Sequence, residues 1–143
     1  MLNIVISKDN KVFESAFTVR KAVFVDEQGF NDFPDETDKL AYHIVAFMED
    51  KIVGCGRLFE ADEDGTYHIG RIAVLNSYRG KGIGYEIMKK IEAFSKENLN
   101  AVTLELSAQK RALDFYIKLG YEIVGDEYLE ENYPHYYMIK TIN

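Results

Sequence analysis

A strand-like run that passes through a glycine-rich turn straight into a helix limits the folds open to this chain more than any other feature. The run Arg71-Ile72-Ala73-Val74 leads into Arg79-Gly80-Lys81-Gly82-Ile83-Gly84, after which apolar residues recur three or four apart and predict a helix over 82–97. Residues 101–108 then alternate between apolar and polar. This strand–helix–strand unit favours parallel pairing of its two strands through a right-handed crossover.

The rest of the chain predicts mainly antiparallel strands around this unit. Runs at 43–48, 52–59 and 67–75 are separated by tight turns and predict a three-strand meander, and residues 2–6 read as an edge strand. The apolar spacing predicts helices over 11–27 and 109–119, and two last strands are predicted over 121–124 and 136–142. The chain is therefore predicted to be an α/β (α+β) protein with a mixed, mostly antiparallel sheet that contains one parallel pair.

The connection between the first helix and the meander has a composition of its own. Residues 26–38 hold acids, Gly29 and Pro34 but no base, which predicts an irregular, exposed loop.

Composition excludes several classes of function. With 143 residues, the chain is predicted to form a single domain over 1–143. A formal net charge of -7 opposes binding to a nucleic-acid backbone. Cys55 is the only cysteine, which excludes an internal disulfide and a multi-cysteine metal site, so we expect a small buried side chain and no metal. No apolar run reaches the ~20 residues of a membrane helix, and the start lacks the features of a signal peptide, so we expect a cytoplasmic protein without membrane contact.

The glycine-rich turn also indicates a chemistry. Glycines at alternate positions allow unusual dihedrals, so successive N–H groups converge on one anion at the positive end of the next helix, and Arg79 and Lys81 add charge. A phosphate or pyrophosphate is the expected ligand. Two better-known phosphate loops do not fit, because Gly84 is followed by Tyr85-Glu86 and the glycines do not complete GxGxxG.

At this point the chain resembles the GNAT superfamily of N-acetyltransferases. Arg79–Gly84 after the strand 71–74 looks like the cofactor loop of that family, and QKRALDFYIKLGY at 109–121 is similar to its downstream segment, a helix that carries a Tyr and ends in Gly-Phe or Gly-Tyr. VRKAVFVDEQG at 19–29 is similar to the first helix of a small bacterial subgroup. The likeness covers nearly the whole chain.

The resemblance implies the acyl-CoA N-acyltransferase fold, with helices on both faces of the sheet and acetyl-CoA bound where the parallel strands splay apart. Tyr116 matches the family Tyr that hydrogen-bonds the CoA sulfur and acts as general acid, and Gln109 stands where many members have an Asn that contacts the cofactor. The implied cofactor-binding residues are Ile72, Ala73 and Val74 for the pantetheine arm, and Arg79, Gly80, Lys81, Gly82, Ile83 and Gly84 for the pyrophosphate.

The implied reaction transfers an acetyl group from acetyl-CoA to a primary amine by direct attack in a ternary complex. The sequence leaves the general base open among Glu27, His43, His68, Glu105 and His135, or a chain of waters. Glu27 is preferred because it lies at the helix-to-loop junction that borders the acceptor site in relatives.

The acceptor is open as well. By the same analogy, the acids of 26–38 and the cluster Asp126, Glu127, Glu130 and Glu131 flank the acceptor end and favour a small cationic amine. Two alternatives remain: a module that binds CoA without catalysis, and an acetyltransferase that acts on a protein. The Tyr-rich segment 133–137 fits either a core strand or the interface of a homodimer.

Overall fold

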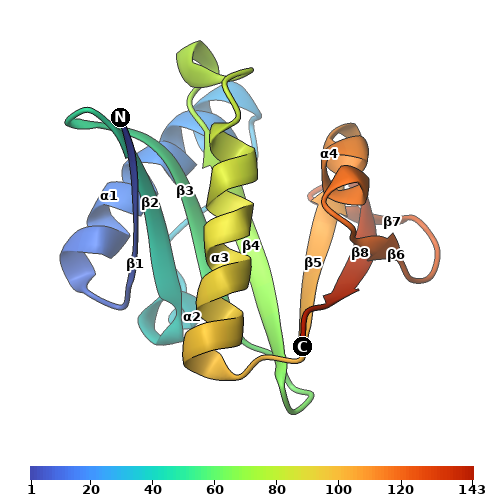
Figure 1. The fold of residues 1–143 in the computed structure, drawn as a ribbon. Coiled ribbons are helices and arrows are strands. Elements are labelled where there is room, and N and C mark those ends of the chain that lie inside the picture. Colours follow the sequence, from blue (N-terminus) through green and yellow to red (C-terminus); the bar gives the residue numbers. More distant parts are fainter.

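One mixed β-sheet runs through the molecule and carries helices on both faces (Figure 1). The computed structural model describes residues 1–143. The strands are β1 (Leu2–Ser7), β2 (Tyr42–Met48), β3 (Lys51–Glu60), β4 (Thr66–Val74), β5 (Thr103–Gln109), β6 (Glu122–Ile123), β7 (Tyr128–Glu130) and β8 (Tyr133–Thr141). The helices are α1 (Asn10–Arg20), the π-helix η1 (Lys21–Glu27), α2 (Glu36–Leu40), the 3-10 turn η2 (Asn76–Tyr78), α3 (Ile83–Leu99), the 3-10 turn η3 (Lys110–Ala112) and α4 (Leu113–Lys118).

The strand order is β1-β2-β3-β4-β5-β8-β6, and β7 pairs with β8. β1 to β4 are joined by antiparallel pairing, as are β5 and β8. β4 and β5 form the one parallel pair and are connected through α3. The predicted meander, the edge position of residues 2–6 and the parallel pair are therefore confirmed.

The two parallel strands pair over only part of their length. Their ladder ends at Ile69 opposite Leu106, although both strands continue beyond that point. Just after it, Arg71 has a φ of 55° and the register of β4 against β3 shifts. Such a bulge bends a strand and increases its twist. The strands therefore meet at one end and separate toward their carboxyl ends, as Figure 1 shows.

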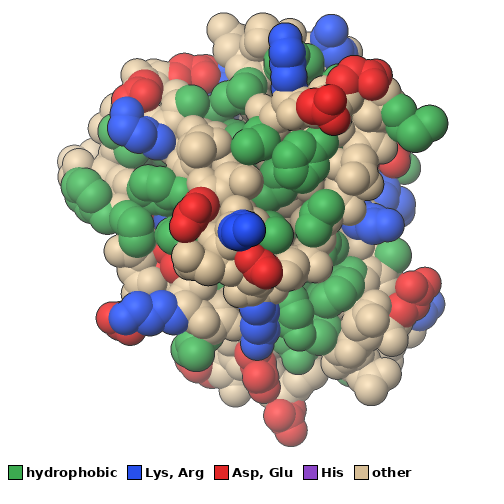
Figure 2. Space-filling view, turned by 90° about the vertical axis from the view of Figure 1, so that its left-hand side faces the viewer, with side chains coloured by type: hydrophobic (Ala, Val, Ile, Leu, Met, Phe, Trp, Pro, Cys, Tyr) green, Lys and Arg blue, Asp and Glu red, His purple; other side chains and the backbone are tan.

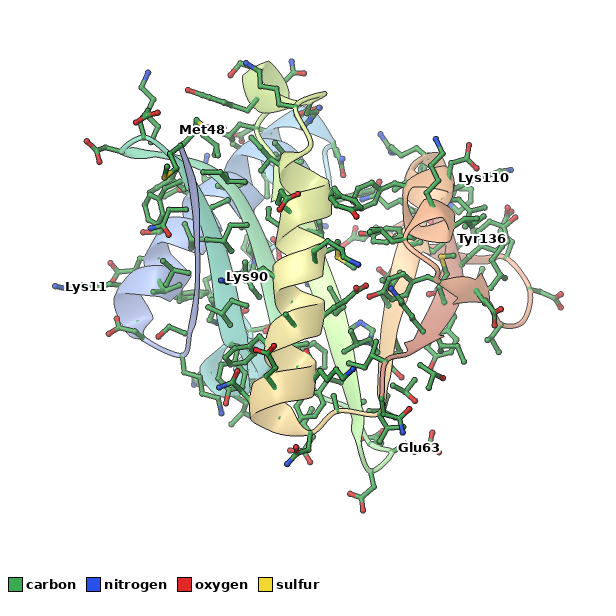
Figure 3. The ribbon with its side chains drawn as sticks, in the orientation of Figure 1. Lys11, Met48, Glu63, Lys90, Lys110 and Tyr136 are labelled. Atoms are coloured by element: carbon green, nitrogen blue, oxygen red, sulfur yellow. The ribbon has the colours of Figure 1, made fainter.

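Two hydrophobic clusters hold the helices to the sheet, one on each face. α3 and α4 pack on one face through Ile83, Ile87, Met88, Ile91, Tyr116 and Leu119. α1 and η1 pack on the other face through Ala16, Val19, Val23 and Phe24. Figure 3 shows side chains filling the space beside the sheet, while Lys11 and Lys110 point away from the molecule.

The structure corrects the predicted boundaries of the helices. The helix predicted over 11–27 is α-helical to Arg20 and continues as the wider η1. The helix predicted over 109–119 begins as the 3-10 turn η3. The last strands also differ, because β7 was not predicted and β8 begins at Tyr133.

The segment 26–38 is the largest correction. It was predicted to be irregular and exposed, but it includes the start of α2 and it buries the carboxylates of Asp32 and Asp38. The physical reason is a set of arginines on the sheet and on α1 that neutralise these acids, as described below. A smaller error concerns Val102, which was expected to alternate inward but is 41% exposed because β5 begins one residue later.

The surface carries charges of both signs. On the face shown in Figure 2, basic and acidic side chains are interspersed among hydrophobic ones, so that face has no extended basic patch. No helix combines the length and the apolar character needed to cross a bilayer.

Candidate active site

Two adjoining cavities occupy the gap between the splayed strands. The loop cavity, about 700 Å³, is lined by the end of β4, the glycine-rich turn, the start of α3, and residues of η3 and α4. The sheet cavity, about 650 Å³, is lined by β4, β5, β8 and the segment that follows η1. Both cavities are lined by Gln28, Ile72, Arg111, Ala112 and Tyr116, so these five residues mark their junction.

Gly80 and Gly82 shape the wall of the loop cavity. Their φ values of +78° and +80° are rarely adopted by L side chains, and no atom lies within 4 Å of the place a Cβ would take. Gly82 is also the N-cap of α3. The first backbone N–H groups of that helix lack partners within it and lie at the positive end of its dipole. The open space and the free donors fit the pyrophosphate of an acyl-CoA.

The side chain of Arg79 is held by the protein itself. Its Nε donates to the carbonyl oxygen of Val74 (2.9 Å), and its Nη1 and Nη2 donate to the two carboxylate oxygens of Glu27 (2.6 and 2.7 Å). These hydrogen bonds lower the pKa of Glu27. A carboxylate held in this way is a weak proton acceptor, and Glu27 lines neither cavity. The prediction that Glu27 is the general base gains no support from its surroundings.

Ile72, Ala73 and Val74 line the loop cavity between the glycine-rich turn and the junction. They lie beyond the point at which β4 stops pairing with β5. Main-chain groups on an unpaired strand edge are ready to bond to an extended ligand. This placement fits binding of the pantetheine arm, which stays a prediction.

Tyr116 lies at the junction, with its ring packed edge-on against Phe115 and Tyr121. Its hydroxyl makes no hydrogen bond within the protein, and burial raises its pKa, so the hydroxyl keeps its proton at neutral pH. A protonated phenol that lines both cavities can donate to a leaving group.

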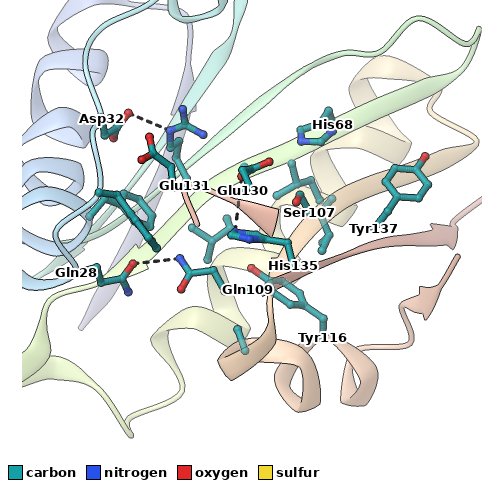
Figure 4. Close-up of a pocket in the computed structure, with 18 of the residues that line it drawn as sticks. Gln28, Asp32, His68, Ser107, Gln109, Tyr116, Glu130, Glu131, His135 and Tyr137 are labelled. Carbon is teal, nitrogen blue, oxygen red and sulfur yellow. Dashed lines mark hydrogen bonds and ion pairs between the residues drawn. The ribbon is translucent and has the colours of Figure 1, made fainter. Parts of the chain in front are cut away.

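A hydrogen-bonded trio of His68, Glu105 and Tyr137 lines the sheet cavity, and Figure 4 labels His68 and Tyr137. His68 and Glu105 are opposite each other in the parallel ladder, with His68 Nδ1 2.6 Å from Glu105 Oε2. Tyr137 donates from its hydroxyl to Glu105 Oε1 (2.8 Å), and burial followed by this contact raises the pKa of Tyr137 to about 12. Because a carboxylate oxygen accepts, Nδ1 is the donor in this hydrogen bond, which leaves Nε2 as the ring nitrogen without a partner in the protein.

The free nitrogen of this histidine faces open space. His68 lines the sheet cavity, and no hydrogen bond within the protein reaches its Nε2. An imidazole oriented by a carboxylate and open on its other nitrogen has the geometry of a general base.

His135 also lines the sheet cavity and is opposite Gln109 in the antiparallel ladder. It is 4% exposed, its Nδ1 donates to the carbonyl oxygen of Tyr133 (2.7 Å), and its Nε2 lies 3.6 Å from Glu130. Glu130 and Glu131 line the cavity near the turn between β7 and β8. These two acids of the predicted cluster therefore belong to the site.

The rest of that acidic cluster lies elsewhere. Glu127 accepts from the hydroxyl of Tyr136 (2.9 Å) and lies 3.5 Å from Lys110 Nζ, and neither Glu127 nor Asp126 lines a cavity.

A buried charge network fixes one wall of the sheet cavity. Arg20 is 1% exposed and donates from Nε and Nη2 to Asp32 (both 2.9 Å) and from Nη1 to Asp38 (2.7 Å). Burial alone raises the pKa of a carboxyl, but the hydrogen bonds from the arginines outweigh it and lower the pKa of both aspartates.

Two more arginines complete this network. Arg57 donates from Nη1 to Asp38 (2.9 Å) and Asp35 (3.1 Å), and Arg71 donates from Nε to Asp32 (3.1 Å). Three arginines therefore balance three aspartates. The network ties the segment 30–32, which lines the sheet cavity, to α1, β3 and β4.

His43, a further candidate base, lines neither cavity. It is buried, its Nε2 is hydrogen-bonded to the carbonyl oxygen of Asp38 (2.9 Å), and burial lowers its pKa. The structure places it with the charge network rather than with the site.

Sequence reasoning missed the charge network and the hydrogen bond between Gln28 and Gln109. One signal for the network was available, because Arg20 interrupts an apolar helix face formed by Ala16, Val19 and Val23 and so predicts a buried partner. No local signal marks Gln28. Its Oε1 accepts from Nε2 of Gln109 (3.1 Å), which is 81 residues away.

Comparisons with known proteins agree with this geometry. The family model described as an acetyltransferase (GNAT) domain matches residues 13–142. The uncharacterized N-acetyltransferase YjcF of Bacillus subtilis (strain 168) is 37% identical over 142 residues, which cover 97% of this chain and 99% of that protein. Escherichia coli ElaA superposes with a TM-score of 0.87 at 26% identity, over 98% of this chain and 99% of that chain.

A further structure shares the fold alone. An aminoglycoside 6'-N-acetyltransferase complexed with coenzyme A superposes with a TM-score of 0.76 at 15% identity, over 100% of this chain and 97% of that chain. Since the family model spans nearly the whole chain, the protein belongs to the GNAT family of acetyltransferases, which transfer acyl groups from coenzyme A.

Proposed function

We propose that the protein transfers the acetyl group of acetyl-CoA to the primary amine of a small molecule, by direct attack in a ternary complex. One observation carries the proposal. A loop cavity suited to a pyrophosphate adjoins, at the proton donor Tyr116, a sheet cavity that contains the His68–Glu105 pair. Donor and acceptor thus have separate compartments that meet at one protonated hydroxyl.

The loop cavity holds the donor, whose thioester supplies the activated acetyl group. Backbone N–H groups of residues 80–84 bind the pyrophosphate, and Lys81, whose Nζ lies over the ring of Tyr78, adds positive charge to the same turn. The free edge formed by Ile72, Ala73 and Val74 binds the pantetheine arm and directs an N–H group at the carbonyl oxygen, where negative charge develops.

His68 is the general base in this proposal. An amine arrives as an ammonium ion and must lose a proton before it can attack. His68 Nε2 takes that proton, directly or through a water, because its Nδ1–H is committed to Glu105. Glu105 then stabilises the imidazolium that forms, and Tyr137 keeps the carboxylate in place.

Tyr116 completes the proton balance. As the bond between the carbonyl carbon and sulfur breaks, the sulfur leaves as a thiolate and takes the phenolic proton. The nitrogen, positively charged once the C–N bond has formed, gives its second proton to the phenolate and so restores Tyr116. Burial raises the pKa of Tyr116, so its protonated form is the one present before this step.

The sheet cavity supports a small cationic acceptor. Its volume of about 650 Å³ lies within the range of small-molecule sites. Glu130 and Glu131 line it with negative charge, and the ring of Tyr128 lines it as well, which suits an ammonium group.

The test is thiol release from acetyl-CoA in the presence of small monoamines, polyamines and lysine-containing peptides. We expect release with a small cationic amine. Tyr116→Phe and His68→Ala should each lower kcat by about 100-fold or more while CoA binding, measured by calorimetry, stays unchanged. Tyr136→Phe removes a hydroxyl that bonds outside both cavities and serves as the control.

Other outcomes would redirect the assignment. Full turnover in Tyr116→Phe would remove Tyr116 from the mechanism. CoA binding without thiol release for any acceptor would favour a non-catalytic CoA-binding module. Release with peptides alone would favour an enzyme that modifies proteins.

A further inference from the structure

The carboxyl end of the π-helix η1 touches both sides of the cleft through two consecutive residues. Glu27 is paired with Arg79, which belongs to the glycine-rich turn after β4. Gln28 accepts a hydrogen bond from Gln109, which ends β5 (Figure 4). η1 therefore links the two strands at the end where they no longer pair with each other.

We propose that Glu27 and Gln28 act as a clasp that sets the width of the cleft and positions acyl-CoA in it. The proposal rests on the proposed function, since it takes the loop cavity to be the donor site. Both are positioning residues: Glu27 acts through Arg79, and Gln28 acts through Gln109.

The π-helical geometry brings these side chains to the cleft. In the last turn of η1, the backbone N–H of Gln28 donates to the carbonyl oxygen of Val23 (2.9 Å), and that of Phe30 donates to Phe24 (2.8 Å). This turn is wider than an α-helical one, and such turns are rare and concentrate at functional sites. Side chains that follow each other around a helix diverge, so Glu27 reaches one wall of the cleft and Gln28 reaches the other.

The first contact of the clasp, the hydrogen bond between Gln28 and Gln109, lies at the junction of the cavities. Gln28 lines both of them, and Gln109 lines the sheet cavity. With Nε2 of Gln109 bonded to Gln28, Gln109 Oε1 is buried without a partner. Exchanging the oxygen and nitrogen of both amides leaves Gln109 with one unpaired polar atom all the same.

A buried polar atom without a partner is costly, and this one belongs to a residue that lines the sheet cavity. The pantetheine arm carries amide groups with both donors and acceptors, so it can satisfy this atom. Gln28 then holds the amide of Gln109 in the one orientation that meets the arm, which saves the ordering cost at the moment of binding.

The second contact of the clasp, the ion pair between Glu27 and Arg79, acts on the glycine-rich turn, where the pyrophosphate is proposed to bind. Arg79 uses Nη1 and Nη2 for Glu27 and Nε for the carbonyl oxygen of Val74. The guanidinium therefore joins η1, the end of β4 and the start of the glycine-rich turn. Its main task here is to hold the turn in shape, which leaves the phosphate contacts to the backbone of residues 80–84.

Two ligands distinguish the effects of the two contacts: coenzyme A, and ADP, which keeps a pyrophosphate but lacks pantetheine. Calorimetry should show that Gln28→Leu, which keeps the size but loses the hydrogen bond, weakens coenzyme A about five- to tenfold and leaves ADP unchanged. Gln28→Glu keeps an acceptor oxygen and should restore binding to within about twofold of the wild type. Glu27→Leu should weaken both ligands.

The matched control is Asp26→Asn. Asp26 lies on the same helix, pairs with Lys21 in solvent and lines neither cavity, so its variant should bind both ligands normally. Wild-type affinity for coenzyme A in Gln28→Leu, or an equal loss for ADP in that variant, would overturn the clasp. If the wild type itself binds no coenzyme A, the proposed function fails first, so the two failures are distinct.

Discussion

Replacing Arg20 by methionine measures how strongly the buried charge network holds the wall of the sheet cavity. Methionine fills a similar volume but removes three charge-assisted hydrogen bonds, two to Asp32 and one to Asp38. Both carboxylates are buried, and each keeps one other arginine, Arg71 or Arg57. Breaking a buried pair by removing one partner costs about 3–5 kcal/mol, and the remaining arginines place our expectation near the lower end.

The assay is urea and thermal unfolding at pH 7. A loss of about 3 kcal/mol corresponds to a fall in Tm of roughly 10 °C for a chain of this length. The control is Lys21→Met at the neighbouring position, whose pair with Asp26 is solvent-exposed and should contribute less than about 1 kcal/mol.

The effect should depend on pH in a defined direction. Pairing lowers the folded-state pKa of Asp32 and Asp38, so their stabilisation is present above the unfolded pKa of about 4 and is lost as pH falls through the folded value. The difference in free energy of unfolding between the wild type and Arg20→Met should therefore be largest at neutral pH and should decrease below about pH 4. Equal stability of the two proteins at pH 7 would refute the reasoning.

Gly82→Ala should lower the free energy of unfolding by about 1–2 kcal/mol, because φ is +80° at this position. The variant should also bind coenzyme A more weakly in calorimetry, because the added methyl group enters the open loop cavity. An unchanged Kd for coenzyme A would contradict the placement of the pyrophosphate. Burial lowers the pKa of His43, so the unfolded chain binds a proton that the folded chain does not, and stability should decline as pH falls below about 6.5. Thermal melts of His43→Gln should lack this decline. If the wild type and His43→Gln lost stability in parallel as pH falls, His43 would not be its cause. Cys55 is 0% exposed and burial raises its pKa to about 12, so a thiol reagent at pH 8 should label it only after unfolding in urea; rapid labelling of the native protein would be inconsistent with this burial.

Much of the fold could be predicted because its signals are local. The glycine-rich turn lies within a few residues of the strand and helix it joins, and the alternation of Leu104 and Leu106 identifies β5 from its own residues. The loop cavity shares this local character, since Gly80, Gly82 and the start of α3 follow closely in the chain. Tyr116 was found through a resemblance, and its position at the junction agrees with that expectation.

The contacts within the sheet cavity could not be predicted in the same way. His68 and Glu105 are each ordinary strand residues, and only the register of the parallel ladder brings the two side chains together. The preference for Glu27 as base rested on its position at the end of a helix. Where its carboxylate points depends on the turn of η1 and on a partner 52 residues away.

The amino-acid order alone determined most of the strands and helices and the place of the glycine-rich turn, because hydrophobic periodicity and glycine dihedrals act over a few residues. Tertiary structure decided which titratable groups meet: whether Asp32 and Asp38 face solvent or arginine, whether Glu27 takes protons or holds Arg79, and which nitrogen of His68 is free. Charge pairing and burial act through space, so their outcome depends on strand register and helix packing rather than on neighbours in the chain.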